Sequence, residues 1–321
     1  MTTKISNLVS RISVAVIAIP ALLYVSYTGG ILFFLLVTAI SILAMKEFYD
    51  LAALKGASPQ RTAGYAAAIF VNLAFFHEQL ESFIVPLFVE RGGGIALLTK
   101  LQMLVTVLFL SLVLILLIEL FRNKGSLFLN AGYTILGVVY VGLFLGALIG
   151  IRELFGNEFP HWLLQRHIGG TTGISDPSIH ATTYAWGGLT IISIFASIWI
   201  CDTAAYFGGL AMGRHKLFER VSPNKTWEGA LWGFVGAVLT MVAAQKFLIP
   251  YLELHQAIMI GLIIGVFGQI GDLVESLFKR DAGVKDSSNI IPGHGGVFDR
   301  FDSLIFVSPI LYLYIDFVVL S

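Results

Sequence analysis

Long apolar stretches alternate with short polar ones along most of this chain. Nine stretches have about the length of roughly 17–25 residues that an α-helix needs to cross a bilayer. Their approximate bounds are 12–28, 31–48, 62–76, 101–121, 131–150, 185–206, 227–245, 257–275 and 304–320. The pattern predicts an all-α polytopic membrane protein with about nine transmembrane helices.

Composition supports this class. Of the 321 residues, 57% are hydrophobic and 12% are charged, and the mean hydropathy is +0.85. A soluble domain carries roughly 25% charged residues. The net charge of zero argues against a protein that binds nucleic acid. The single cysteine, Cys201, excludes an intrachain disulfide and a metal site built from cysteines.

The basic residues predict the orientation. If the N-terminus lies inside, 15 of the 20 Lys and Arg residues fall in the inner loops and 5 in the outer ones. Cytoplasmic loops carry such an excess. We therefore expect a cytoplasmic N-terminus, in the inner membrane if the cell is bacterial.

The chain divides into two regions of different character. Residues 1–150 read as hydrophobic helical hairpins, in which Glu47 and Glu119 are interpreted as helix-end charges. Residues 151–321 contain the polar groups and are predicted to form a C-terminal catalytic membrane region. The segments 77–100 and 151–184 are predicted to be long loops whose roles stay open.

One polar stretch, residues 272–303, stands between two apolar segments. Its charged residues are Asp272, Glu275, Lys279, Arg280, Asp281, Lys285, Asp286, Asp299, Arg300 and Asp302, with His294 among its glycines. Charged groups at a bilayer boundary are costly and indicate a functional site. Carboxylates bind hard divalent cations, whereas Lys, Arg and glycine-rich backbone bind phosphates.

Two upstream segments offer partners for this stretch. Trp199, Asp202 and Tyr206 are spaced to share one helical face. Asp202 would there meet water or a cation, or else serve as a packing hydrogen bond or a helix-end charge. Ser222 or Thr226 could cap the next helix, whose N-terminus beside Lys225 would attract an anion; the alternative is an ordinary basic loop.

The polar stretch itself begins on a helix. Gln269, Asp272, Glu275, Ser276 and Lys279 recur at spacings of three or four and so lie near one another. Further on, Asp299 and Asp302 could bind a shared metal, although Asp302 could equally cap the last helix.

The residue types indicate a reaction class. No Walker A loop or Gly-x-Gly-x-x-Gly motif is present, and no Ser-His-Asp pattern stands out. Three carboxylates, at Asp202, Asp272 and Asp299, together with several cations suit phosphoryl or nucleotidyl transfer with one or two metal ions. A phosphate monoester, with a second pKa of about 6, is largely ionised at neutral pH and needs no strong base.

A long motif carries a family resemblance. The pattern Ser-x2-Lys-Arg-x4-Lys-Asp-x5-Pro-Gly-His-Gly-Gly-x2-Asp-Arg-x-Asp runs from Ser276 to Asp302. It resembles the signature of the phosphatidate cytidylyltransferases, also called CDP-diacylglycerol synthases. The segments Asp202–Tyr206 and Ser222–Gly229 are similar to that family's other motifs, so the resemblance is dense over residues 199–303.

The resemblance implies a reaction and an architecture. CTP and phosphatidate would give CDP-diacylglycerol and pyrophosphate for phospholipid synthesis, with Mg²⁺ and, as an open alternative, a second cation. It further implies a homodimer embedded in membrane lipid, with no nucleic-acid partner and a polar cavity open to the cytoplasm and laterally to lipid.

It also implies roles for individual residues. Asp272 and Asp299 are expected to bind metal, with Asp202 as a further ligand or a supporting acid. The cations Lys225, Lys279, Arg280, Lys285 and Arg300 would hold phosphates, and His294, Gly295 and Gly296 would shape the turn. Ser222 and Asp286 are also expected to contact substrate. The catalytic set is predicted to be Asp272, Asp299, Lys279, Arg300 and His294.

Three other readings remain open from the sequence. An ion-coupled transporter would place carboxylates near the bilayer midplane and show internal repeats, and no repeat is found here. A non-catalytic scaffold or inactive homologue would be expected to lose charged signature positions, all of which are intact. The CDP-alcohol phosphotransferases carry an Asp-Gly-x2-Ala-Arg pattern that this chain lacks.

Overall fold

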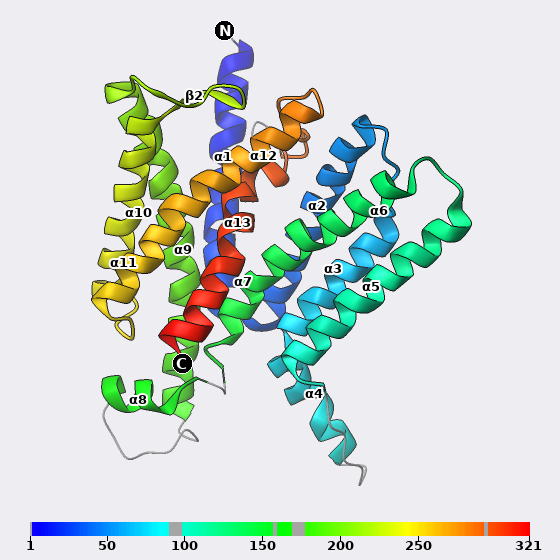
Figure 1. The fold of residues 1–321 in the computed structure, drawn as a ribbon. Coiled ribbons are helices and arrows are strands. Elements are labelled where there is room, and N and C mark those ends of the chain that lie inside the picture. The colour runs from blue at the N-terminus through cyan, green and yellow to red at the C-terminus, as the bar shows by residue number, and fades with distance from the viewer. Residues whose placement is uncertain (1, 90–97, 157–158, 169–176, 292–294) are drawn as a thin grey trace.

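The computed structural model describes residues 2–89, 98–156, 159–168, 177–291 and 295–321, and it forms an elongated bundle of helices (Figure 1). The helices of the first half are α1 (Thr2–Thr28), α2 (Gly30–Leu54), α3 (Arg61–Phe75), α4 (His77–Val89), α5 (Lys100–Arg122), α6 (Leu127–Leu136), η1 (Gly137–Leu143) and α7 (Phe144–Glu153). Those of the second half are α8 (His161–Ile168), α9 (Pro177–Met212), α10 (Trp227–Phe247), α11 (Leu254–Ile263), η2 (Ile264–Gly268), α12 (Gln269–Asp281), α13 (Phe298–Tyr314) and η3 (Ile315–Val319).

The described residues contain seven helices that are long and apolar enough to cross a membrane. An eighth is obtained if α3 and α4, which meet at a bend of 79°, count as one broken span. The apolar part of α1, Ala15–Thr28, is shorter. The prediction of a polytopic all-helical membrane protein is thus confirmed, while the number nine stays a prediction.

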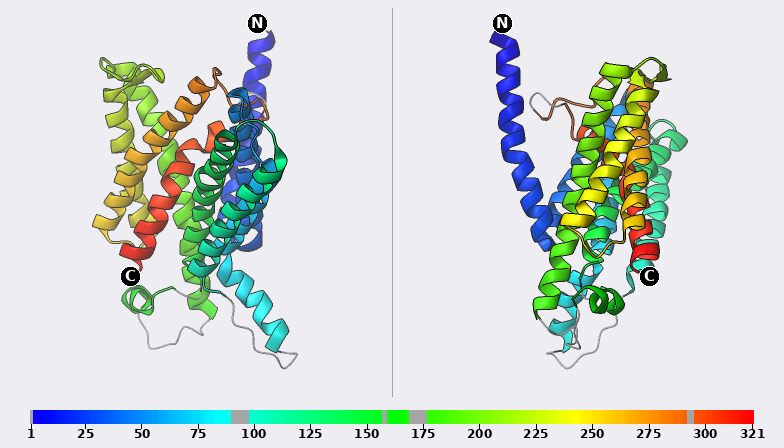
Figure 2. Two further views of the ribbon diagram at one scale, coloured as in Figure 1. Left: turned by 45° about the vertical axis from the view of Figure 1, so that its right-hand side comes forward. Right: turned by 90° about the vertical axis from the view of Figure 1, so that its left-hand side faces the viewer.

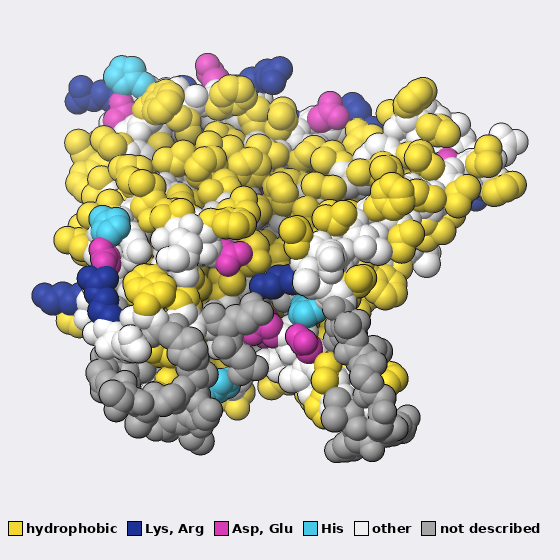
Figure 3. All heavy atoms as spheres, turned by 60° about the horizontal axis from the view of Figure 1, so that its bottom comes forward, with side chains coloured by type: hydrophobic (Ala, Val, Ile, Leu, Met, Phe, Trp, Pro, Cys, Tyr) yellow, Lys and Arg dark blue, Asp and Glu magenta, His cyan; other side chains and the backbone are white. Residues whose placement is uncertain are grey.

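The outer surface has the character expected of a protein in lipid. Figure 3 shows hydrophobic side chains over the upper middle of one face, with charged groups along its upper and left edges and again below its centre. Helix α5 is the clearest case, because only 11% of its most apolar window is buried inside the protein. A helix that is apolar all round and still exposed is suited to contact acyl chains.

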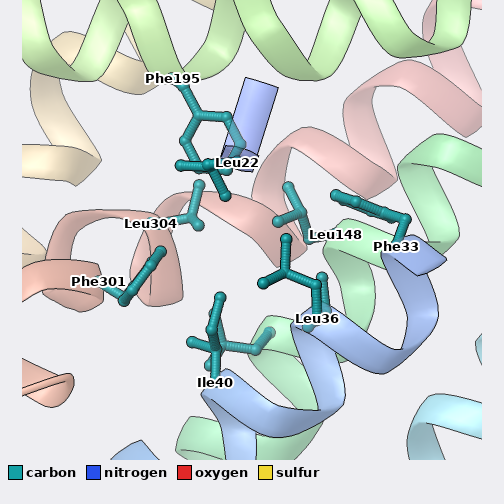
Figure 4. Close-up of a pocket in the computed structure, with 10 residues that line it drawn as sticks. Leu22, Phe33, Leu36, Ile40, Leu148, Phe195, Phe301 and Leu304 are labelled. Atoms are coloured by element: carbon teal, nitrogen blue, oxygen red, sulfur yellow. The ribbon is translucent and has the colours of Figure 1, made fainter. Parts of the chain in front are cut away.

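The interior is closely packed by small residues and aromatic rings. Helices α9 and α10 approach at Gly233, where an added Cβ would lie 2.9 Å from the Cys201 carbonyl oxygen. Between α1, α2, α7, α9 and α13 there is only a small apolar pocket, of about 10 Å³, into which Leu22, Phe195 and Leu304 project (Figure 4). A space of that size without polar partners does not hold a water molecule.

A short hairpin interrupts the helices. Strands β1 (Lys216–Phe218) and β2 (Ser222–Thr226) pair antiparallel. The sequence suggested Ser222 or Thr226 as the cap of the following helix. Thr226 is the cap, since its Oγ1 accepts from the Gly229 N–H at 3.2 Å, whereas Ser222 pairs with Phe218 in the hairpin.

The two ends of the bundle differ (Figures 1 and 2). The hairpin, the α5–α6 connection and the α12–α13 loop lie at one end, and α4, α8 and the C-terminus lie at the other. The segments 77–100 and 151–184, predicted as loops, therefore contain helices α4 and α8 and the first turns of α9. The end with the hairpin also holds the polar stretch, and it is called the signature end below.

Candidate active site

A cavity of about 750 Å³ opens between α9, α10, α12 and α13 at the signature end, with the hairpin at its edge. The charged side chains along its wall are Asp202, Lys216, Lys225, Asp272, Asp299, Arg300 and Asp302. Helices separated by up to a hundred residues supply these groups. The cavity therefore brings together five of the residues that the sequence selected, namely Asp202, Lys225, Asp272, Asp299 and Arg300.

Helix α9 contributes the face that the spacing predicted. Trp199, Asp202 and Tyr206 all line the cavity. The Asp202 side chain is exposed there, although it lies within an apolar helix. This carboxylate thus faces the cavity that Lys225 and Arg300 also line.

Ion pairs connect the cavity wall. Lys225 Nζ lies 2.6 Å from Asp272 Oδ2 and joins the end of β2 to α12. On the next turns of α12, Lys279 Nζ lies 2.7 Å from Glu275 Oε2 and 2.8 Å from Asp299 Oδ1. The predicted polar face of α12 is therefore present, and Lys279 joins it to the start of α13.

Three carboxylates converge inside this network. Asp272, Glu275 and Asp302 each place one oxygen so that all three oxygens lie within 4.8 Å of one another. Glu275 is 1% exposed, and among the described residues no donor contacts its Oε1. Buried carboxylate oxygens without donors are poorly stabilised unless a cation binds them. Hard oxygen ligands of this kind suit Mg²⁺.

This group differs from the predicted ligand set. Asp272 belongs to both, and Glu275 and Asp302 join it here, while metal binding by Asp299 and Asp202 stays a prediction. Helix α13 begins at Phe298 after Val297, so the alternative that Asp302 caps the helix is wrong.

Backbone contact fixes the spacing of these acids. Gly271, next to Asp272 on α12, lies against α13 so closely that an added Cβ would be 2.8 Å from the Asp302 carbonyl oxygen. No other residue fits there without moving one helix. The separation of the carboxylates on α12 and α13 is thereby set by the packing of two backbones.

Asp299 organises the loop before α13. Besides Lys279, its carboxylate accepts from the Ser287 N–H at 3.2 Å and from the Gly296 N–H at 2.9 Å. Gly295 has a positive φ of 81°, a conformation that glycine adopts without strain. The predicted turn-shaping role of the two glycines agrees with this geometry, whereas His294 lies outside the described residues.

Comparisons with known proteins show the family. The cytidylyltransferase family matches residues 9–318. The chain belongs to this family. It is 30% identical over 301 residues to a phosphatidate cytidylyltransferase of Staphylococcus epidermidis, covering 94% of this chain and 96% of that protein. It is 31% identical over 306 residues to one of Synechocystis sp., covering 95% of both chains. The family resemblance inferred from the sequence is confirmed.

Other residues that the sequence assigned to the site are not among those that line the cavity of this cytidylyltransferase-family chain. Arg280 donates to the carbonyl oxygens of Val221 and Val284 at 3.3 and 3.2 Å. Lys285 and Asp286 are exposed on the α12–α13 loop. Substrate contacts by these residues, and by Ser222 in β2, therefore stay predictions.

Glu47 is the residue that the sequence reading misjudged. It lies two turns inside α2 and is fully buried, so its interpretation as a helix-end charge is wrong. Its carboxylate binds Ser287, Ser288 and the backbone at the start of α13. A carboxylate inside an apolar segment was the available signal, but nothing in the sequence indicated a partner about 240 residues away.

Proposed function

We propose that this protein transfers the cytidylyl group of CTP to phosphatidate, giving CDP-diacylglycerol and pyrophosphate. The observation that carries the proposal is a polar cavity, with a carboxylate cluster and basic side chains, that is adjacent to an apolar groove. A reaction between a water-soluble nucleotide and a membrane lipid needs both environments at one place.

The groove differs from the cavity in its apolar lining and lies beside it. It has a volume of about 540 Å³ between α10 and the α11–α12 span, and Trp227, Leu231, Phe234, Val266 and Leu273 are among the residues that line it. Leu217, Ala230 and Gln269 line both spaces. A lipid with its acyl chains in the groove would extend its phosphate into the cavity. This arrangement supports phosphatidate as the acceptor.

The residues fit a divalent metal. Asp272, Glu275 and Asp302 would hold Mg²⁺ through oxygen atoms, with Asp202 and Asp299 on the same wall as further acids. When bound, Mg²⁺ neutralises the charge that develops on the phosphates during nucleotidyl transfer. Whether a second cation binds stays open.

The reaction requires the protein mainly to position the reacting groups. A phosphate oxygen of phosphatidate forms a bond to the α-phosphorus of CTP, and the bond from that phosphorus to the pyrophosphate oxygen breaks. The attacking phosphate is ionised at neutral pH, so no strong base is required. Lys225 and Arg300, both on the cavity wall, would hold phosphate oxygens and keep attack and departure in line. Lys279 would act through Asp299.

Orientation and assembly extend the proposal. The signature end carries the loops in which basic residues are concentrated, which supports a cytoplasmic cavity where CTP is available. A homodimer remains the expectation from the family resemblance; light scattering of the detergent-solubilised protein, corrected for bound detergent, measures it.

One assay tests the activity. Purified protein in detergent receives CTP labelled in the cytidine, phosphatidate and Mg²⁺, and label is followed into the organic phase. We expect labelled lipid that is absent with diacylglycerol in place of phosphatidate and absent after chelation, and that returns when Mg²⁺ is added back. Lack of labelled lipid under all metal conditions would overturn the proposal.

A further inference from the structure

The loop that precedes α13 is anchored to the N-terminal half of the protein by one side chain. The Glu47 carboxylate accepts four hydrogen bonds, two on each oxygen. Oε1 accepts from the Ser288 hydroxyl at 2.7 Å and from the Val297 N–H at 2.9 Å. Oε2 accepts from the Ser287 hydroxyl at 2.7 Å and from the Phe298 N–H at 2.8 Å. The carboxylate therefore bridges both ends of the segment 287–298.

The two amide donors belong to the first turn of α13. The first N–H groups of a helix have no partner within it, and the helix dipole makes this end attractive to negative charge. Val297 has no side chain that could cap the helix, and Glu47 from α2 supplies the missing acceptor. Removing it would leave buried donors unsatisfied, which destabilises the start of the helix.

The same loop segment is held from the opposite side by a cavity residue. Asp299 accepts from the Ser287 and Gly296 N–H groups, while Glu47 accepts from the Ser287 hydroxyl. Gly296 lies between the two carboxylates, and an added Cβ would come within 2.3 Å of Glu47 Oε2. A shift at Glu47 would therefore be passed through Ser287 to Asp299.

We propose that Glu47 is a positioning residue for the reaction. By fixing the first turn of α13 and both ends of the segment 287–298, it places Asp299, Arg300 and Asp302 on the cavity wall. Glu47 itself does not line the cavity, and it acts only through this segment. The inference rests on the proposed function for its kinetic readout, but its structural readout is independent of activity.

The first test is hydrogen–deuterium exchange of the detergent-solubilised protein, without substrate. In Glu47→Gln, an amide N–H₂ faces donors that need an acceptor, so we expect faster exchange over residues 287–301 and unchanged exchange in α5 and α9. The double variant Ser287→Ala/Ser288→Ala removes two of the four bonds and keeps the charge. It should increase exchange over the same residues by a smaller amount. This variant keeps the inference testable if Glu47→Gln does not fold.

The second test is kinetic. A displacement of about 1 Å in catalytic groups can lower a rate about 100-fold. We expect kcat per folded molecule to fall by roughly 10–100-fold in Glu47→Gln and by a smaller factor in the double serine variant, while KM for CTP changes less than kcat. Glu47→Asp, which keeps the charge on a shorter side chain, should lie between the wild type and Glu47→Gln.

A matched control exists in the same half of the protein. Glu119 on α5 is also a buried carboxylate with several donors, from Gln60, Asn130 and Arg122, but it does not contact the segment 287–298. Glu119→Gln should lower thermal stability without changing kcat per folded molecule or the exchange of that segment. Wild-type exchange and kcat in folded Glu47→Gln would overturn the inference. An inactive wild type with loosened segment 287–301 in Glu47→Gln would instead overturn the proposed function alone.

Discussion

Two buried carboxylates of the N-terminal helices, Glu47 and Glu119, have different surroundings from the acids beside the cavity. Around Glu47 and Glu119 every carboxylate oxygen accepts at least one hydrogen bond from a side chain or the backbone. At the cavity, Lys225 pairs with Asp272 and Lys279 with Glu275, but one oxygen each of Asp272, Glu275 and Asp302 still lies within 4.8 Å of the other two. A carboxylate surrounded by donors is complete without a ligand, whereas a set of facing carboxylates repel each other until a cation joins them.

The difference distinguishes carboxylates that stabilise the fold of the bundle from carboxylates proposed to take part in the chemistry. Residue type alone would class all five acids together. Their partners distinguish them.

The largest effect is expected at the cavity cluster. Asp272→Asn removes a carboxylate that faces Glu275 and Asp302 and pairs with Lys225. A metal ion contributes several kcal/mol to stabilising the transition state, so kcat should fall by about 1000-fold or more, measured as labelled lipid formed per minute.

The matched control for this variant is Asp281→Asn. Asp281 lies at the end of the same helix, is exposed and pairs with Lys55 at 3.3 Å. An exposed ion pair contributes little to stability, and turnover should stay within about twofold of the wild type. Near-normal activity of Asp272→Asn in Mg²⁺ would contradict the contrast between the two groups of acids.

A smaller effect is expected from the basic side of the cavity. Lys225→Ala removes a cation that would hold phosphate and leaves Asp272 without its ion pair. Charge-assisted contacts of this kind contribute about 1.5–3 kcal/mol, so kcat/KM should fall by roughly 10–100-fold, with part of the loss recovered in Lys225→Arg. Lys246→Ala, near the far end of α10, should be without effect; equal losses in both would show that overall charge, and not the cavity, is responsible.

The apolar groove should respond to filling. Val266 is 42% exposed and lines the groove, and Val266→Trp would occupy space expected to take an acyl chain. We expect KM for long-chain phosphatidate to rise by about threefold to tenfold, with little change for a dioctanoyl substrate. Leu239→Trp, exposed on α10 and outside the residues that line the groove, should leave both unchanged; the same rise for both chain lengths would argue against the groove.

The smallest effect is expected far from both groups. Thr99 caps α5 in a reciprocal pair with Gln102. Loss of such a cap costs about 1 kcal/mol, so Thr99→Ala should lower the thermal midpoint by a few degrees with unchanged kcat. Thr99→Ser keeps the hydroxyl and should restore the midpoint; a change in kcat would show that α5 is coupled to the cavity.

Much of the fold could be predicted because lipid imposes a simple rule. A segment that crosses a bilayer must satisfy its backbone within a helix and expose apolar side chains, so hydropathy locates the helices. The rule ends where the chain leaves the apolar layer. The β1–β2 hairpin and the helices α4 and α8 lie in such places, and no periodicity marked them.

The sequence predicted which residues belong to the candidate site better than it predicted which of them contact one another. Spacing brought Trp199, Asp202 and Tyr206 to one face, as the cavity shows. It could not tell that Asp299 would pair with Lys279 while Asp302 faced Asp272. Two aspartates three residues apart lie on nearly the same face of a helix, so the sequence does not distinguish them. The neighbouring helix decides which of them contacts which partner.

The close contact at Gly271 has a consequence for ion preference. Because two backbones touch beside Asp272, the opening between the acids of α12 and α13 cannot widen freely to suit a larger ion. Mg²⁺ requires oxygens at about 2.0–2.1 Å, whereas Ca²⁺ takes them at about 2.3–2.6 Å and in greater number. Gly271, which has no side chain, would thus set the distance between the acids and so the size of the ion that they bind. A methyl group added there would change which ion fits.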